Sequence, residues 1–365
     1  MADKKLDVVL LFGGRSAEHD VSTLSARSVR AAADPARLNI IPVCIRRDGQ
    51  FLDPAGSMAI LDGASFRAGA APASFSFEMW IREHRPDAVF PLIHGTTGED
   101  GTLQGYLEML DLPCVGSGVT ASAVGMDKWF MKAAFATAGL PIVRQVTAST
   151  LDWRDERQSI LDRVEARLML PFFVKPANAG SSVGVSKVKT IAELDAAVAK
   201  AFRFDEKILI EEGIDAREVE VSVLGNETPE VSLPGEIVLG REFYDYEDKY
   251  IEDKSSLVIP ADLPPEKIAE IREMGAKAFK AIGASGYARV DFFIERTSGQ
   301  VLVNEINTIP GFTRISMYPK LWEASGLPYP RLIERLVDLA IQRWQSRQDR
   351  FVGMMSWFDE VKRLT

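Results

Sequence analysis

Continuous apolar runs in the first third of the chain predict strands that are buried on both faces. Three segments have this character: 6–12 (LDVVLLF), 38–45 (LNIIPVCI) and 87–95 (DAVFPLIHG). Strands covered on both faces lack polar alternation, which is typical of parallel sheets. Helical periodicity lies between the runs, as in residues 21–33 (VSTLSARSVRAAA). We therefore predict an open α/β domain over residues 1–120, with its functional loops at the carboxyl ends of the strands.

The rest of the chain divides into further parts. Residues 121–215 continue the alternation, with these predicted elements: a helix over 119–138, a strand over 171–175, a helix over 190–202 and a strand over 207–214. From Glu218 onward, apolar and polar residues alternate with period two, which is typical of an antiparallel sheet with one buried face. A helix over 264–282 and two more strands complete the part that spans 216–345. The prediction is an α/β protein whose C-terminal part is α+β.

Two segments stand outside this pattern. Residues 240–256 are polar, aromatic and charged without a usable period, so we predict a long surface loop of the length at which lids occur. The tail, residues 346–365, has large apolar side chains at helical spacing: Phe351, Met354, Met355 and Phe358. We interpret the tail as a helix packed on the body or on a partner subunit, and we assign it no function.

Composition and charge narrow the class of protein. Hydrophobic residues make up 46% and charged residues 26% of the 365 positions, as in an ordinary soluble protein of two or three domains. A net charge of −9 argues against binding to nucleic-acid phosphates, which needs a basic face. No apolar run reaches the length of a membrane span, and the N-terminal segment lacks the features of a signal peptide. We predict that Cys44 and Cys114 are buried free thiols, and we expect a cytoplasmic protein.

A loop of small residues follows the predicted strand in LPFFVKPANAGSSVGVSKV, residues 170–188. Successive N–H groups and hydroxyls in such a loop can bind an anion, because glycine lets the backbone approach closely. Lys175 precedes the glycines, so G-x-x-x-x-G-K-[ST] is absent, and no G-x-G-x-x-G follows the first strand. We interpret the stretch as a phosphate loop of another architecture, with Lys175 as a fixed cation. A flexible surface hairpin loop is the alternative.

Polar side chains gather on two neighbouring predicted strands, 286–295 (GYARVDFFIE) and 300–312 (QVLVNEINTIPGF). Each strand places two of them on one face: Arg289 with Asp291, and Glu305 with Asn307. A hairpin register that pairs Asp291 with Glu305 also pairs the arginine with the asparagine, and leaves residues 296–300 as the loop. Buried carboxylates need compensation, and this set of oxygens suits Mg²⁺. A salt-bridge network around the arginine is the alternative.

Paired carboxylates also end the predicted strand in LIEEGI, at Glu211 and Glu212. Carboxylates at such a strand end could accept hydrogen bonds from adenine or ribose. The alternative interpretation is that both glutamates are simply exposed to solvent. Together with a phosphate loop, a lysine and a Mg²⁺ face, the pattern indicates a site for a nucleoside triphosphate.

Two N-terminal loops lie at the end of the predicted sheet where ligands bind. GGRSAEHDVS places Glu18 between a glycine turn and a helix that begins near Asp20 or Ser22. HGTTGEDGTLQG places His94 at the end of a strand. Capping of the helix is the alternative role for Glu18 or His19. The histidines lack the spacing of a zinc site, and no serine-hydrolase motif G-x-S-x-G is present.

Seven motifs occur along the chain in this order: GGRSAEHDVS, HGTTGEDGTLQG, VGMDKWFMK, VKPANAGSSVGVSKV, FYDYEDKY, ARVDFF and NEINTIPGFT. Their order and spacing resemble those of the D-alanine–D-alanine ligases, a family of ATP-grasp enzymes, over residues 6–345. The resemblance implies an ATP-grasp fold with an N-terminal open parallel α/β domain. It also implies ATP and D-alanine as substrates, two Mg²⁺ ions with Mn²⁺ as an alternative, and a homodimer.

The resemblance implies roles for individual residues, each assigned by position. ATP-binding positions are matched by Lys128, Lys175, Ser182, Glu211, Glu212, Ile214, Glu218 and Lys249. Substrate-binding positions are matched by Glu18, His94, Arg289, Gly311, Ser316 and Met317. Metal-binding positions are matched by Asp291, Glu305 and Asn307. Catalytic positions are matched by Glu18, Ser181, Tyr250, Arg289 and Gly311.

The reaction of this family proceeds through an acyl phosphate. ATP phosphorylates one D-alanine, and the amine of a second D-alanine displaces the phosphate to give a dipeptide for peptidoglycan synthesis. The resemblance implies that Glu18 orients the first D-alanine, and that Arg289 and the Gly311 N–H stabilise the oxyanion. It also implies that the predicted lid excludes water, which would hydrolyse the acyl phosphate.

Tyr250 separates two substrate classes within the family. Relatives that make D-alanyl-D-lactate carry histidine at this position and a cation near Met317, so we expect an amine as the second substrate here. Glu212 departs from members that have lysine there. The alternatives are a D-alanine–D-lactate ligase, another ATP-grasp carboxylate–amine ligase, and a nucleotide sensor without turnover, which would not need the complete metal and oxyanion set.

Overall fold

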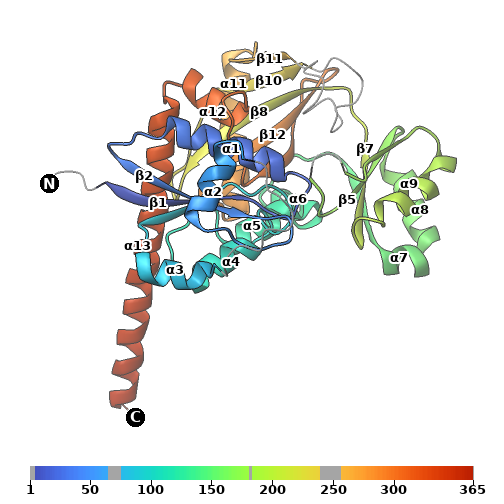
Figure 1. Cartoon of the computed structure of the whole chain (residues 1–365). Coiled ribbons are helices and arrows are strands. Elements are labelled where there is room, and N and C mark those ends of the chain that lie inside the picture. Colours follow the sequence, from blue (N-terminus) through green and yellow to red (C-terminus); the bar gives the residue numbers. More distant parts are fainter. Residues whose placement is uncertain (1–4, 65–74, 181–182, 239–255, 365) are drawn as a thin grey trace.

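The computed structural model describes residues 5–64, 75–180, 183–238 and 256–364, and its strands form three sheets (Figure 1). The first sheet is parallel, in the order β2-β1-β3. Its elements are β1 (Leu6–Gly13), α1 (His19–Ala32), β2 (Leu38–Ile45), α2 (Pro54–Leu61), α3 (Phe77–His84), β3 (Ala88–Pro91) and α4 (Thr102–Met109). The three predicted strands are confirmed, although the third is shorter than its apolar run.

Both faces of β1 are covered from Val8 to Phe12, which explains why these five residues are all apolar. Val8, Leu10 and Phe12 lie in a core cluster with residues of α1 and of the C-terminal helix. Val9 and Leu11 point the other way, into a cluster with residues of α3 and α4. Since successive side chains of a strand alternate between faces, no position from Val8 to Phe12 is left for a polar residue.

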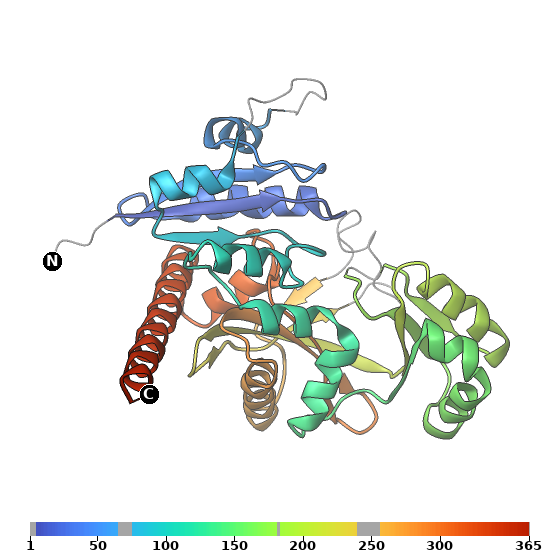
Figure 2. The ribbon, with the colours of Figure 1, turned by 90° about the horizontal axis from the view of Figure 1, so that it is seen from below.

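The second sheet is antiparallel, in the order β4-β7-β5-β6, and lies with its helices at one end of the molecule (green in Figures 1 and 2). Its strands are β4 (Gln145–Ser149), β5 (Phe172–Pro176), β6 (Ser186–Val188) and β7 (Lys207–Glu212). Its helices are α7 (Thr150–Asp155), α8 (Arg157–Arg167), the short η1 (Ile191–Glu193) and α9 (Leu194–Ala201). The predicted strands and the helix near residue 190 are confirmed in this region.

The prediction of one helix over 119–138 is wrong. Two helices form instead: α5 (Val119–Met126) and α6 (Lys128–Thr137). Asp127 separates them, because its side chain accepts hydrogen bonds from the N–H groups of Trp129 and Phe130 and so caps α6. The break places Lys128 in the first turn of α6.

The third sheet is antiparallel, in the order β11-β10-β8-β12-β13, with β9 paired to β8. Its strands are β8 (Ala216–Gly225), β9 (Glu230–Val231), β10 (Gly235–Val238), β11 (Ser256–Val258), β12 (Gly286–Glu295) and β13 (Val301–Asn307). Two helices belong to this region, α11 (Pro265–Ala281) and α12 (Met317–Ala324). The period-two alternation predicted from Glu218 onward corresponds to this sheet, but the second sheet is antiparallel as well.

The β12–β13 hairpin has the predicted register at its polar end: Asp291 pairs with Glu305, and Arg289 with Asn307. A β-bulge follows Asp291, with Asn304 as the extra residue of β13. Beyond the bulge the pairing is shifted, so Ile294 pairs with Val301. The predicted loop over 296–300 therefore differs from the structure by one residue on one side.

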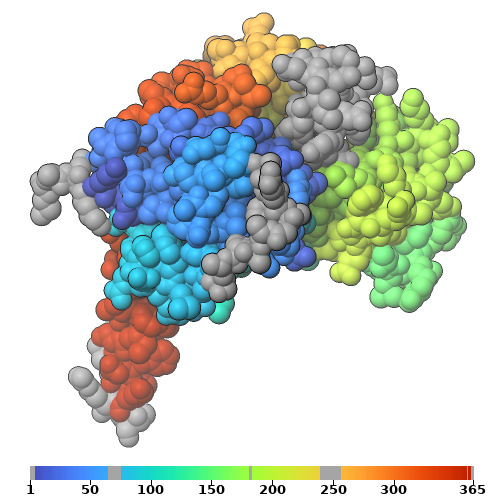
Figure 3. Space-filling model, in the orientation of Figure 1, coloured from blue at the N-terminus to red at the C-terminus, as the bar shows by residue number. Residues whose placement is uncertain are grey.

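The C-terminal helix, α13 (Tyr329–Leu364), extends beyond the body of the protein (Figures 1 and 3). Its first part is buried in the core, through Leu332, Ile333, Leu336 and Val337. Its projecting part has apolar side chains that are 44–66% exposed: Phe351, Val352, Met354, Met355, Trp357 and Phe358. The predicted helix is confirmed. Arg347 and Gln348 at the start of the tail donate to Asp111 on the body, but the apolar side chains that follow do not pack on it, and packing on a partner subunit stays a prediction.

The parallel sheet and the large antiparallel sheet share one hydrophobic core. Phe90 of β3 lies in contact with Tyr287 of β12 and with Phe312, at ring-centroid distances of 6.3 and 5.7 Å. Tyr287 and Phe312 also contact each other, with centroids 5.7 Å apart. This packing brings the loop after β3 against the segment after β13, and so it positions the candidate site.

Both cysteines are buried free thiols, as predicted. Burial raises the pKa of the Cys44 thiol to about 12 and that of the Cys114 thiol to about 11, so both stay protonated and inert at neutral pH. Among the described residues, none of the helices combines the length and the apolar character that crossing a bilayer requires.

Candidate active site

The loop after β1 meets the predicted phosphate loop at Glu18. A Cβ placed on Gly95 would lie 2.9 Å from Oε2 of Glu18, and a Cβ placed on Gly180 would lie 3.7 Å from the same atom. Gly95 follows β3, and Gly180 lies between β5 and β6. Glu18 is the residue that precedes α1, but its side chain makes no capping hydrogen bond. The carboxylate therefore sits between two loops, and the capping alternative does not describe it.

The first residues of the predicted phosphate loop are anchored. Nζ of Lys128 donates to the carbonyl of Ala179 at 2.9 Å. The N–H of Asn178 donates to Asp205 at 2.7 Å, and its amide group donates to Asp127 at 3.3 Å. The loop thus begins in a fixed position beside the first turn of α6. A freely flexible hairpin loop does not describe these residues.

Two lysines share one buried carboxylate between α6 and the second sheet. Glu211 on β7 forms ion pairs with Lys132 and with Lys175, and Lys132 is only 1% exposed. Burial acts to raise the pKa of the Glu211 carboxyl, but the two ammonium groups outweigh it and lower the pKa to about 2. One negative and two positive charges leave a net positive charge, which suits a polyphosphate.

Three further positions that match ATP-binding residues of the family, Glu212, Ile214 and Glu218, differ in burial and in their contacts. Glu212 is buried, pairs with Arg144 at 2.5 Å and accepts the N–H of Met169 at 2.9 Å. The alternative of two exposed glutamates is therefore wrong. Ile214 is half-buried in the turn between β7 and β8, and Glu218 is half-buried on β8. The carboxylate of Glu212 is held by protein contacts in this structure.

Arg289 on β12 is surrounded by carboxylates. Its Nε and Nη2 donate to the two oxygens of Asp291, each at 2.7 Å, and Nε lies 3.1 Å from Glu220. Burial disfavours the charge, but the pKa of Arg289 is raised because Asp291 and Glu220 outweigh burial. Glu305 lies 3.6 Å from Nζ of Lys128. Arg289 thus forms a network with Asp291 and Glu220. The charge of Glu305, the other predicted metal-binding carboxylate, is balanced by Lys128 instead.

The predicted metal ligands lie on paired positions of β12 and β13. Oδ1 of Asn307 accepts the N–H of Ile309 at 3.0 Å, which fixes the amide beside Asp291 and Glu305. Among the described residues, no three His, Cys, Asp or Glu side chains form a metal-binding group. Mg²⁺ in nucleotide sites, however, commonly takes one or two carboxylates and completes its shell with phosphate and water oxygens. Two carboxylates and one amide oxygen fit that donor set.

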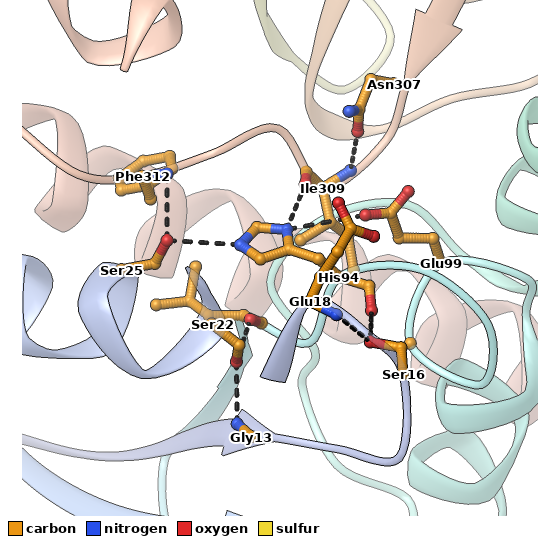
Figure 4. Close-up of polar contacts among 12 residues, drawn as sticks. Gly13, Ser16, Glu18, Ser22, Ser25, His94, Glu99, Asn307, Ile309 and Phe312 are labelled. Atoms are coloured by element: carbon orange, nitrogen blue, oxygen red, sulfur yellow. Dashed lines mark hydrogen bonds and ion pairs between the residues drawn. The ribbon is translucent and has the colours of Figure 1, made fainter. Parts of the chain in front are cut away.

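His94 lies at the centre of a buried polar cluster (Figure 4). Its Nδ1 is 3.0 Å from the carbonyl of Ile309 and 3.5 Å from Glu99, and its Nε2 is 3.2 Å from Oγ of Ser25. Burial acts to lower the pKa of His94, but the hydrogen bond and charge of Glu99 and the charge of Glu18 outweigh it and raise the pKa. His94 therefore connects α1, the loop after β3 and the segment after β13.

Gly311 and Ser316 lie side by side between β13 and α12. A Cβ placed on Gly311 would lie 3.0 Å from Oγ of Ser316, so a larger residue would be crowded there. Oγ of Ser316 accepts the N–H of Thr313 at 3.0 Å. Met317 is buried and begins α12. The structure thus brings the predicted substrate positions of this segment together.

Family comparison identifies the chain. A sequence model described as the D-ala D-ala ligase N-terminus matches residues 7–117, and one described as the D-ala D-ala ligase C-terminus matches residues 134–338. The chain belongs to the D-alanine–D-alanine ligase family. The resemblance stated from the seven sequence motifs is confirmed.

Relatives of this ligase-family chain match it over nearly their whole length. The D-alanine–D-alanine ligase of Geobacillus kaustophilus is 46% identical over 356 residues, which cover 94% of this chain and 97% of the relative. That of Halothermothrix orenii is 48% identical and covers 93% of this chain and 99% of the relative.

Solved structures confirm the predicted α/β ATP-grasp fold. The D-alanine–D-alanine ligase of Coxiella burnetii superposes with a TM-score of 0.81 at 38% identity, covering 96% of this chain and 100% of the other. The VanG D-Ala:D-Ser ligase of Enterococcus faecalis superposes with a TM-score of 0.80 at 34% identity, covering 92% and 100%.

Some site positions of this ligase-family chain lie outside the described residues: Ser181, Ser182, Lys249 and Tyr250. Sequence reasoning also missed Lys132, although its spacing of four from Lys128 in VGMDKWFMK places both on one side of a helix. Nothing in the sequence indicated Ser25, because its partners lie 69 and 287 residues away along the chain.

Proposed function

We propose that this chain joins two D-alanine molecules to D-alanyl-D-alanine with ATP, through a D-alanyl phosphate, for peptidoglycan precursor synthesis. The observation that carries the proposal is the position of Glu18 beside Gly180 of the phosphate loop. A D-amino acid whose ammonium group pairs with Glu18 would have its own carboxylate on the side of the nucleotide phosphates. Phosphorylation of that carboxylate creates a good leaving group, as amide formation requires.

The nucleotide side is supported by three lysines on two elements. Lys128 and Lys132 come from α6, and Lys175 comes from the end of β5. Lys128 and Lys175 would hold ATP phosphates, and Ser182 and Lys249 belong to the same proposal. Adenine and ribose would lie near the end of β7 and the start of β8, at these positions: Glu211, Glu212, Ile214 and Glu218.

Asp291, Glu305 and Asn307 would hold Mg²⁺, with Mn²⁺ as an alternative. When bound, the metal supplies positive charge that offsets the charge of the transferring phosphoryl group. The two metal-side carboxylates are held in register by the β12–β13 ladder, so this chain's own contribution is to present them at a fixed separation.

The acyl-transfer side rests on Arg289 of β12 and on the segment after β13. Arg289 and the N–H of Gly311 would stabilise the oxyanion of the tetrahedral intermediate as the second amine attacks. Ser316, at the start of α12, and Met317 would contact the carboxylate of the second D-alanine. Glu18, His94, Ser181 and Tyr250 would surround the first D-alanine.

Phosphate release tests this proposal directly. With ATP and Mg²⁺, release should depend on D-alanine, and the product mass should be that of D-alanyl-D-alanine. D-Serine and D-lactate are compared as second substrates, because one structural relative is a D-Ala:D-Ser ligase. Release that does not depend on D-alanine would overturn the proposal, and a mixed dipeptide as main product would revise the second substrate.

Three further features also remain proposals: the homodimer, the cytoplasmic location and the division of the chain into parts. A homodimer and a cytoplasmic location agree with the family, and sedimentation or light scattering of the purified protein measures the first. The division into residues 1–120, 121–215, 216–345 and 346–365 is supported by the three sheets and the projecting helix. Limited proteolysis that cuts near these boundaries would support the division.

A further inference from the structure

The segment after β13 is held by hydrogen bonds on both sides of Gly311. On the near side, Ile309 donates its N–H to Asn307 and accepts from Nδ1 of His94, both at 3.0 Å. On the far side, Phe312 donates its N–H to Oγ of Ser25 at 3.3 Å, and its carbonyl accepts from the hydroxyl of Tyr329. These bonds fix the backbone that carries Gly311 from two directions.

The N–H of Gly311 is the exception within this segment. In the part of the chain that the structure describes, it donates to no protein acceptor, whereas the N–H groups of Ile309, Phe312 and Thr313 are all taken. Pro310 has no N–H. The segment therefore presents one backbone donor between anchored neighbours, which is the arrangement expected of an oxyanion-binding amide.

Two of the anchors come from one connected pair in the N-terminal part of the chain. Ser25 on α1 is fully buried, and its Oγ lies 3.2 Å from Nε2 of His94. A carbonyl only accepts, so Nδ1 of His94 carries the proton donated to Ile309. Nε2 accepts the Ser25 hydroxyl in the neutral ring and donates to Oγ in the charged ring, and both arrangements leave a lone pair of Oγ for the N–H of Phe312. Figure 4 shows the contacts of this pair with both sides of the segment.

We propose that Ser25 is a positioning residue: together with His94 it holds the Ile309–Phe312 segment so that the Gly311 N–H stays in place for the oxyanion. The inference rests on the role given to Gly311 under the proposed function. Ser25 itself touches neither substrate nor nucleotide in this proposal. Its effect passes through the backbone, and displacement by about 1 Å of such a donor is enough to reduce turnover strongly.

The test compares Ser25→Ala with Ser57→Ala in the full-length protein. Ser57 is also fully buried in the α/β part, accepts the N–H of Cys44 at 2.8 Å and makes no contact with the segment. Both variants leave one buried N–H without its hydroxyl partner, so both should lower the melting temperature similarly. Only Ser25→Ala should lower kcat, by about tenfold or more, with KM for ATP unchanged.

Two further readouts separate positioning from general destabilisation. A phosphinate that mimics the tetrahedral intermediate should bind Ser25→Ala about tenfold more weakly, while D-alanyl-D-alanine binds as before. Ser25→Cys, which keeps a weak donor and acceptor of similar size, should recover part of kcat. If Ser25→Ala keeps both kcat and phosphinate affinity, or loses no more than Ser57→Ala, the positioning role is wrong.

Amide hydrogen exchange tests the same contact without turnover. Peptides that cover residues 309–313 should exchange faster in Ser25→Ala than in wild type, and at the wild-type rate in Ser57→Ala. Equal exchange in all three proteins would overturn the inference. The wild-type phosphate-release assay tests the proposed function separately, so a failure of one is distinguishable from a failure of the other.

Discussion

Two groups of residues in the candidate site are held in different ways. The first group lies on strands: Lys175, Glu211, Arg289, Asp291, Glu305 and Asn307. The second lies on loops: Glu18, His94, Glu99 and Gly311. The direction of a strand side chain follows from the ladder of backbone hydrogen bonds. The direction of a loop side chain depends on a few contacts with segments far away in the sequence.

Because of this difference, we expect substitutions on the strands and substitutions on the loops to affect catalysis in different ways. On the strands, a substitution removes a charge or a ligand and leaves the frame in place. On the loops, a substitution that touches no substrate can still move a catalytic group. His94 illustrates the second case, because its partners come from α1 and from the segment after β13.

The largest expected effect is on the strands. Glu305→Ala should abolish ATP-dependent phosphate release, because it removes one of two carboxylates from the predicted metal set. Glu295→Ala is a matched control, because Glu295 is the last residue of β12 and is not part of the predicted metal set, so this variant should keep normal turnover. Normal phosphate release by Glu305→Ala would mean that the metal assignment is wrong.

A steric change should have the next largest effect, and it tests the loops. A Cβ on Gly98 would lie 2.0 Å from the carbonyl oxygen of Ile93, so the loop that carries His94 and Glu99 would have to shift. We expect Gly98→Ala to lower kcat by about tenfold or more. In Gly105→Ala the nearest atom would be 3.7 Å from the new Cβ, and steady-state kinetics should be normal. Equal kinetics in both variants would show that the loop tolerates displacement.

Removing the buried charge of Lys132 should lower the stability of the fold more than it changes the shape of the site. Lys132→Met leaves Glu211 with Lys175 as its remaining ion-pair partner, and should lower the free energy of unfolding by about 3 kcal/mol in urea titrations. Arg335→Ala breaks a solvent-exposed pair with Glu230 and should change it by about 0.5 kcal/mol. Similar losses in the two variants would contradict the importance of burial at Glu211.

The smallest expected effect is on the acid dependence of stability. The Glu211 carboxyl has a pKa of about 2 in the folded protein against an ordinary 4.5, because two lysines outweigh burial. Its stabilising contribution is therefore complete above pH 4.5 and is lost as the pH falls through about 2. Lys132→Met should raise the folded pKa, so unfolding free energies measured over this window should fall less steeply than in wild type. An unchanged slope would show that Lys132 does not lower the pKa of Glu211.

Sequence periodicity predicted the positions of site residues correctly where these residues lie on strands. Period-two alternation placed Arg289 with Asp291 and Glu305 with Asn307 on paired faces, and the register confirmed it. The same reasoning missed the bulge at Asn304, because one extra residue leaves no mark in the apolar pattern. It also treated residues 119–138 as one helix, since periodicity does not record that Asp127 caps a second one.

The sequence by itself determined the fold class, the shared faces of the polar strand residues and the family, because local periodicity and motif spacing are properties of neighbouring residues. Only the tertiary structure decided what surrounds each charge. It paired Glu211 with both Lys132 and Lys175, and it set His94 between Ser25 and Ile309. Such contacts join residues that are distant along the chain, and they arise because the parallel sheet and the large antiparallel sheet bury their apolar faces in one core.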